Sequence, residues 1–153
     1  MVETLENSYR GILSYLLFAL RPVLMMKSEY VCRRDMPGIE MFFILRGKIR
    51  QRRPDETART LSAGIQFEEY ALLAPEDEKY RYHTCAIVSS PQAQLFSFSR
   101  IEFQYVFSLF LVNYFGFRNI NENLGHWRKF LEQRTIICRI FSVERLLIVI
   151  ILN

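Results

Sequence analysis

The feature that most constrains the fold is a succession of short, strand-like segments between Val23 and Phe98, each ended by turn-forming residues. β-Branched and aromatic residues suit a half-buried sheet, while glycine, proline, asparagine and aspartate mark turns. The candidate strands are VLMM, EYVCRR, EMFFILRG, KIRQRR, ARTLSAG, TCAIVSS and AQLFSFS. Several short strands at close spacing predict a β-barrel or a jelly roll.

Helical periodicity flanks this region on both sides. Residues 3–21 place leucines at helical spacing, and Pro22 ends the pattern. Residues 101–110 and 119–133 show the same periodicity after the last strand. We therefore predict an α+β fold, an antiparallel, jelly-roll-like β-roll flanked by an N-terminal helix and C-terminal helices.

Composition indicates one folded domain. The chain has 153 residues, of which half are hydrophobic and 14% aromatic, so a disordered chain is excluded. We assign residues 1–134 to the domain and residues 135–153 to a hydrophobic tail of unknown role. The net charge of +4 does not call for a nucleic acid or an anionic membrane as partner. Three scattered cysteines indicate a reducing compartment rather than a disulfide framework.

Membrane insertion is not expected. The first residues, MVETLENSYR, lack the basic and apolar regions of a signal peptide. The longest apolar run, LLIVIIL at residues 146–152, is much shorter than the roughly 20 residues of a spanning helix. We expect a soluble cytoplasmic chain that does not span the membrane.

Three segments, in this order, carry a resemblance: EYVCRRDMPGIEMFFILRGKI, LSAGIQFEEYALL and TCAIVSSPQAQLFSFSRIEFQYV. Together they resemble a cyclic-nucleotide-binding domain, in particular the cytoplasmic gating domain of animal cyclic-nucleotide-gated and hyperpolarisation-activated ion channels. The resemblance covers residues 16–106. It implies that residues 119–133 are a lid helix over the base, that cAMP or cGMP is the ligand, and that other channel subunits or domains are partners in an oligomeric parent protein at the cytoplasmic face of the plasma membrane.

The phosphate cassette of that family runs Phe-Gly-Glu, a short apolar helix, and then Arg-Thr-Ala or a close relative. Phe67 takes the aromatic place and Glu69 that of the glutamate which binds the ribose hydroxyl. Glu68 stands where the pattern has glycine, and His83 stands where it has the arginine that pairs with the phosphate. The full candidate ligand-binding set is Leu61, Gly64, Phe67, Glu69, Ala71, Leu72, Arg81, His83, Thr84 and Cys85.

These departures make the cassette acidic. Carboxylates at positions 68, 69 and 76–78 surround a site that should hold a monoanion. Loss of a buried arginine–phosphate pair costs roughly 2–5 kcal/mol of binding free energy. On a strand, Arg81 and His83 would share one face, so Arg81 could replace the missing arginine. Ser28 and Asp35 likewise stand where the family has turn glycines.

Other chemistries find little support. In RGKIRQRR, Arg46, Lys48, Arg50 and Arg52 alternate and predict one basic sheet face, either merely solvated or a patch for anionic lipid or an acidic domain. No aromatic platform accompanies these bases, so nucleic acid is not expected. Two histidines and scattered cysteines supply no metal site, and no catalytic nucleophile is evident, so we do not expect an enzyme.

Two main functions remain open. The first is a regulatory domain of an ion channel subunit that couples ligand occupancy to gating, with weakened or lost nucleotide binding. The second is a structural or subunit-contact module of the same fold that binds no nucleotide. A fragment of a kinase regulatory subunit is less well supported, because tandem domains and a basic inhibitor segment are not seen.

Overall fold

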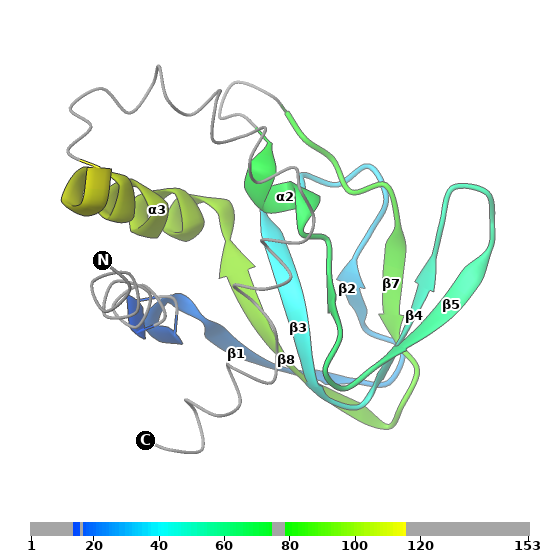
Figure 1. Cartoon of the computed structure of the whole chain (residues 1–153). Helices are drawn as coiled ribbons and strands as arrows, with labels where there is room; N and C mark the ends of the chain where they lie inside the picture. The colour runs from blue at the N-terminus through cyan, green and yellow to red at the C-terminus, as the bar shows by residue number, and fades with distance from the viewer. Residues whose placement is uncertain (1–13, 16, 75–78, 116–153) are drawn as a thin grey trace. The chain divides into compact units, whose positions relative to one another are not determined.

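The computed structural model describes residues 14–15, 17–74 and 79–115 (Figure 1). Leu20–Arg100 form one compact unit, which holds all the strands of the described residues, and the remaining described residues belong to a second unit. The predicted lid helix at 119–133, the domain limit at residue 134 and the tail at 135–153 lie outside the described residues.

The strand unit consists of two antiparallel sheets (Figure 1). The first has the order β1-β8-β3-β6 and consists of β1 (Arg21–Met26), β8 (Gln92–Ser99), β3 (Glu40–Arg46) and β6 (Gln66–Phe67). The second has the order β2-β7-β4-β5 and consists of β2 (Tyr30–Cys32), β7 (Cys85–Val88), β4 (Lys48–Arg52) and β5 (Ala58–Ser62). This arrangement confirms the predicted β-roll.

One core lies between the inward faces of the two sheets. From the first sheet it includes Phe42, Ile44 and Leu95, and from the second Ile49 and Val88, all buried. In β4 the burial alternates strictly, because every second side chain of a strand points to the same face. Burial of these side chains is the main source of stability for the roll.

The turns include the two positions where the family pattern has glycine. Ser28 and Asp35 take positive φ values of 73° and 67°, so the backbone keeps the left-handed conformation although a side chain is present. Gly47, between β3 and β4, has a φ of 95°, and a Cβ there would come within 2.6 Å of the Gln92 carbonyl oxygen. Glycine is therefore required at position 47 by both backbone conformation and space.

The helices differ from the predictions at their limits. Residues 14–15 and 17–19 are helical, but Arg21, which we expected in the first helix, lies in β1. The predicted helix at 101–110 is α3 and extends over Arg100–Phe115. The short α2 covers Tyr70–Leu73. Within the described ranges, no helix has both the length and the apolar character needed to cross a membrane.

Candidate functional site

The cassette begins at Phe67, the last residue of β6, with a firmly packed aromatic ring. Phe67 is 1% exposed and stacks on Phe42 with ring centroids 5.4 Å apart. Gly64 precedes it with a φ of 91°, and its N–H donates to the carbonyl of Ile44 at 2.9 Å. The aromatic predicted at the start of the cassette is thus an anchor between the cassette and the sheet.

Glu68 follows Phe67 with a φ of 63°, the left-handed conformation that the family pattern fills with glycine. The residue is 8% exposed, so its side chain lies inside the protein although it carries a carboxylate. Charged side chains are almost never this buried unless they have partners. The partners of Glu68 therefore determine what this position does.

Those partners form a polar network on the inward side of β4 and β5. The Thr84 hydroxyl donates to Glu68 Oε1, and Gln51 Nε2 donates to the same oxygen at 3.2 Å. Gln51 Nε2 also donates to Thr84 Oγ1 at 3.0 Å, and Arg59 Nε donates to Gln51 Oε1 at 2.8 Å. The network thus joins the cassette to β4, β5 and the approach to β7, and it ends on a guanidinium.

Burial raises the pKa of the Glu68 carboxyl, while the hydrogen bonds from Thr84 and Gln51 oppose that rise. Burial, and then the nearby charge of Glu68, raise the pKa of the Cys32 thiol to about 12. Burial followed by the charges of Glu68 and Glu69 raises the pKa of Tyr80 to about 12. The cassette is thus an environment that disfavours further negative charge.

The short helix of the cassette, α2, is bonded to the residues just before it. The Ala71 N–H donates to the Glu68 carbonyl at 3.0 Å, and the Leu72 N–H donates to the Glu69 carbonyl at 3.1 Å. Glu69 is half-buried at the N-cap and makes no capping hydrogen bond with its side chain. Two backbone N–H groups at the start of α2 are therefore already bonded within this turn.

Arg81 and His83 are both exposed, but neither lies in a strand as we predicted: Arg81 forms an isolated bridge with Pro37, and His83 is in a bend before β7. The Arg81 guanidinium donates to the carbonyl of Asp35, in the turn that precedes β3. His83 contacts Tyr80 edge-on, with ring centroids 5.6 Å apart. No described hydrogen bond brings either side chain to the Glu68 network, whereas Thr84, one residue further along, belongs to it.

The other candidate residues separate into two groups. Leu61, Ala71 and Leu72 are all buried, and the first two belong to the core between the sheets. Cys85 pairs with Arg52, an exposed position of β4, so it lies on the opposite face of that sheet. There its sulfur accepts a hydrogen bond from the Arg34 N–H at 3.3 Å. The structure therefore brings Phe67, Glu69, Ala71, Leu72 and Thr84 together around Glu68, and leaves Cys85 outside.

Comparison with known proteins supports the fold. No family model and no curated protein matches the chain. A solved structure, that of a cyclic nucleotide-binding-like protein from Brucella abortus, is similar with a TM-score of 0.54. The two chains are 20% identical, and the match covers 64% of this chain and 84% of the other. The fold of this chain is cyclic-nucleotide-binding-like.

Within this cyclic-nucleotide-binding-like fold, the sequence analysis missed two site residues, Gln51 and Arg59. The pattern contained a signal for the first. Of the four basic residues predicted to share one face, Arg46 ends β3 in the other sheet, while Lys48, Arg50 and Arg52 lie on the outer face of β4. Gln51 must then point inward with Ile49. A polar side chain at an inward position requires a partner there, and Glu68 and Thr84 supply it. Arg59 is opposite Gln51 in the register of β4 and β5 and could be inferred only from the pairing.

Proposed function

We propose that this chain is a cyclic-nucleotide-binding-like regulatory domain in which nucleotide binding is weakened or lost. The observation that carries the proposal is the buried carboxylate of Glu68, which accepts the Thr84 hydroxyl. The resemblance places Thr84 among the ligand-binding residues. A protein carboxylate thus uses a donor that a bound cyclic phosphate would need.

The charges near the cassette support the same conclusion. A cyclic phosphate carries one negative charge, and burying it near Glu68 and Glu69 would place like charges together at low dielectric. Two guanidiniums near the cassette already have partners: Arg81 donates to the Asp35 carbonyl, and Arg59 donates to Gln51. His83 is exposed and packs against Tyr80, and its charge only opposes the rise in the Glu68 pKa. A missing arginine–phosphate pair alone corresponds to a loss of roughly 2–5 kcal/mol.

Isothermal titration of the full chain with cAMP and with cGMP tests this proposal. We expect no heat of binding at millimolar nucleotide. Glu68→Gly restores the residue of the family pattern, suits a φ of 63°, and removes the carboxylate. This variant should bind nucleotide at least about tenfold more tightly than the natural chain, because one like charge is gone and the Thr84 hydroxyl is released.

Glu56→Gly is the matched control. Glu56 has nearly the same φ, 64°, but lies exposed in the connection between β4 and β5. Its substitution makes the same chemical change without touching the cassette, so affinity should stay that of the natural chain. Micromolar binding by the natural chain, or equal affinities in the two variants, would contradict the proposal.

For the biological context we propose a subunit of an ion channel, on the strength of the three segments that resemble channel gating domains. In that setting lid closure would couple occupancy to the pore. The genomic neighbourhood of the reading frame tests this proposal. Membrane-spanning segments encoded upstream of Met1 would support it, and their absence from the mature transcript would oppose it.

The Glu68 network also favours the second function, a structural or subunit-contact module of the same fold. A carboxylate held by Thr84 and Gln51 keeps the cassette ordered without a ligand. Under this function Glu68→Gly should lower thermal stability and leave nucleotide binding undetectable. The titration above therefore distinguishes a suppressed binding site from a module that has no site.

A further inference from the structure

The outer face of the second sheet carries a straight row of basic side chains. Lys48, Arg50 and Arg52 are all exposed on β4, while Ile49 and Gln51 between them are buried. Side chains at alternate strand positions lie about 7 Å apart. Since β4 lies between β7 and β5, the row crosses the middle of the sheet rather than an edge.

The neighbours of this row are short or uncharged. In the register of the sheet its cross-strand partners are Ser62, Thr60 and Ala58 on β5, and Ile87 and Cys85 on β7. The long basic side chains therefore extend beyond the residues beside them. None of these partner positions carries a carboxylate, so no cross-strand neighbour within the described sheet neutralises the row.

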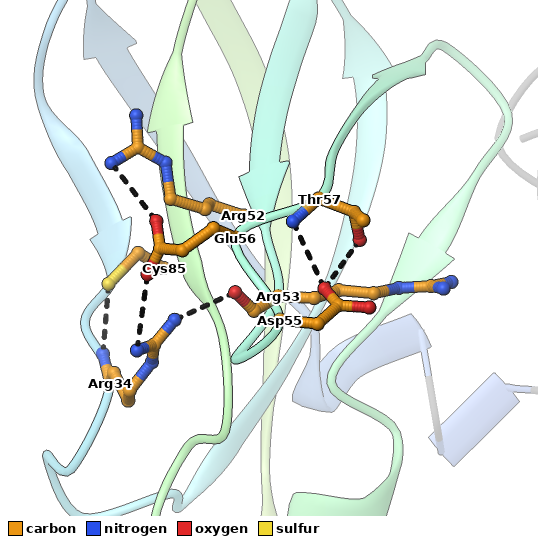
Figure 2. Close-up of polar contacts among 7 residues, drawn as sticks. All are labelled: Arg34, Arg52, Arg53, Asp55, Glu56, Thr57 and Cys85. Atoms are coloured by element: carbon orange, nitrogen blue, oxygen red, sulfur yellow. Dashed lines mark hydrogen bonds and ion pairs between the residues drawn. The ribbon is translucent and has the colours of Figure 1, made fainter.

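At the Arg52 end of the row, a glutamate in the turn between β4 and β5 forms ion pairs with two arginines (Figure 2). Glu56 lies 3.7 Å from Arg52 and 3.8 Å from Arg34, and its side chain is 67% exposed. Such exposed pairs contribute little and remain open to other anions. Arg34 is fixed by its hydrogen bond to the Arg53 carbonyl at 2.8 Å, so it adds a positioned guanidinium at this end.

Strand β2, at the edge of the sheet beside β7, adds an aromatic residue, Tyr30. Tyr30 is opposite Ile87, which is opposite Arg50, so the three share the outer face. A register shift between Tyr30 and Cys32 turns the tyrosine outward while Cys32 stays in the core. The Arg33 guanidinium lies over the Tyr30 ring, 4.1 Å from its centroid.

We propose that this basic face, consisting of Lys48, Arg50, Arg52, Arg33, Arg34 and Tyr30, binds the phosphate-bearing surface of an anionic membrane. The flat surface of an anionic membrane can contact a row in the middle of a sheet along its whole length. Tyrosine is also favoured at the level of the lipid headgroups. Single-stranded nucleic acid fits less well, because Arg33 already covers one face of the single aromatic ring in the basic face.

An extended acidic peptide also fits less well. The row lies on a strand whose two edges are paired with β7 and β5, so such a peptide would gain no main-chain hydrogen bonds there. The inference concerns the face opposite the cassette and does not depend on whether a nucleotide binds.

Sedimentation of the full chain with vesicles of phosphatidylcholine, with and without phosphatidylserine, tests the proposal. Binding should require phosphatidylserine and weaken with added salt. Lys48→Glu should lower the partition coefficient about 25-fold, because each unit of charge near an anionic surface changes it about fivefold. The substitution is on the exposed face, and circular dichroism verifies that the variant is folded.

Lys79→Glu is the matched control. Lys79 is exposed and lies outside the basic face. Because this variant also replaces a lysine by a glutamate, its net charge equals that of Lys48→Glu. It should bind phosphatidylserine vesicles within about twofold of the natural chain. Three outcomes would overturn the proposal: no binding to phosphatidylserine vesicles, equal losses in the two variants, or tighter binding of a single-stranded oligonucleotide than of the vesicles.

Discussion

Glu68 shows how a single residue can preserve the shape of a site and change its charge. Its backbone takes the conformation that glycine has in the family pattern, so the turn into α2 is kept. Its side chain adds a buried carboxylate that Thr84 and Gln51 satisfy. Breaking such a network by removing one partner costs more than replacing the whole network, because a buried polar group is left without a hydrogen bond.

Stability should depend on the protonation of Glu68. Its pKa in the folded chain is raised above the ordinary value of 4.5, mainly by burial. The folded state then binds the proton more tightly than the unfolded state, so this group stabilises the fold most below pH 4.5. That contribution is lost as the pH rises through the raised pKa. Glu68→Gln should therefore flatten the pH dependence of the urea midpoint above pH 4.5.

Glu56→Gln provides the control for this measurement. Glu56 is exposed and forms weak ion pairs with Arg34 and Arg52, so the variant should keep the pH dependence of the natural chain. If the urea midpoint changed with pH identically in the natural chain and in Glu68→Gln, then Glu68 would titrate alike in the folded and unfolded states. That result would contradict its burial.

Cys32 should be chemically silent in the folded chain. Its thiol has a pKa of about 12, because burial and the charge of Glu68 oppose the thiolate. The thiolate is the reactive form, so a thiol reagent at pH 8 should label Cys32 only after unfolding. In a Cys85→Ser/Cys138→Ser background the labelling rate should equal the unfolding rate. Keeping Cys85 instead of Cys32 should give faster labelling, since Cys85 is only half-buried.

At the scale of single residues, the sequence predicted which residues lie in the cassette better than it predicted where their side chains point. The pattern placed Phe67, Glu69 and Thr84 at the cassette, and the structure brings all three there. It could not show that Glu68 turns inward, because side-chain direction at a positive φ does not follow strand alternation. It also could not pair Gln51 with Arg59, since that contact depends on the register of two strands.

Turn chemistry explains which elements could be located in advance. Turn residues bound the longer strands, so their limits were predicted within a few residues. β6 was missed because two residues, Gln66 and Phe67, show no alternation. The four residues of α2 likewise show no helical period, and only the family pattern indicated it.

Gly47→Ala should destabilise the turn between β3 and β4 by about 2–4 kcal/mol. The positive φ costs about 1 kcal/mol for alanine, and the overlap with the Gln92 carbonyl and the Ala93 backbone adds about 1–3 kcal/mol. Gly64→Ala separates the two effects, because φ is also positive there but nothing lies within 4 Å. It should lose only about 1 kcal/mol. Equal losses in urea unfolding would show that space plays no part at position 47.

At the scale of the whole molecule, the fold was predicted from the order of the segments, because most of the strands pair with strands that are distant in the chain, β5 with its neighbour β4 being the exception. The similarity to a cyclic nucleotide-binding-like structure agrees with that order. Function did not follow from it, since a fold supports many sites and the deciding features here are a few charges. Those charges, at Glu68 and along β4, become interpretable only once the two faces of the second sheet are assigned.

The two sheets share one core, so they should unfold together. Ile44 in β3 and Ile49 in β4 are both 0% exposed and belong to the same buried cluster. Truncating either to alanine should cost about 2–5 kcal/mol. In a cooperative unit, a loss of unfolding free energy lowers the protection of all its most protected amides equally. Each variant should therefore lower amide protection in β8 and in β7 by the same free energy. Hydrogen exchange measures both strands in one experiment. If Ile49→Ala lowered protection in β7 but left β8 unchanged, the sheets would be separate cooperative units, and the core between them would not be what holds the roll together.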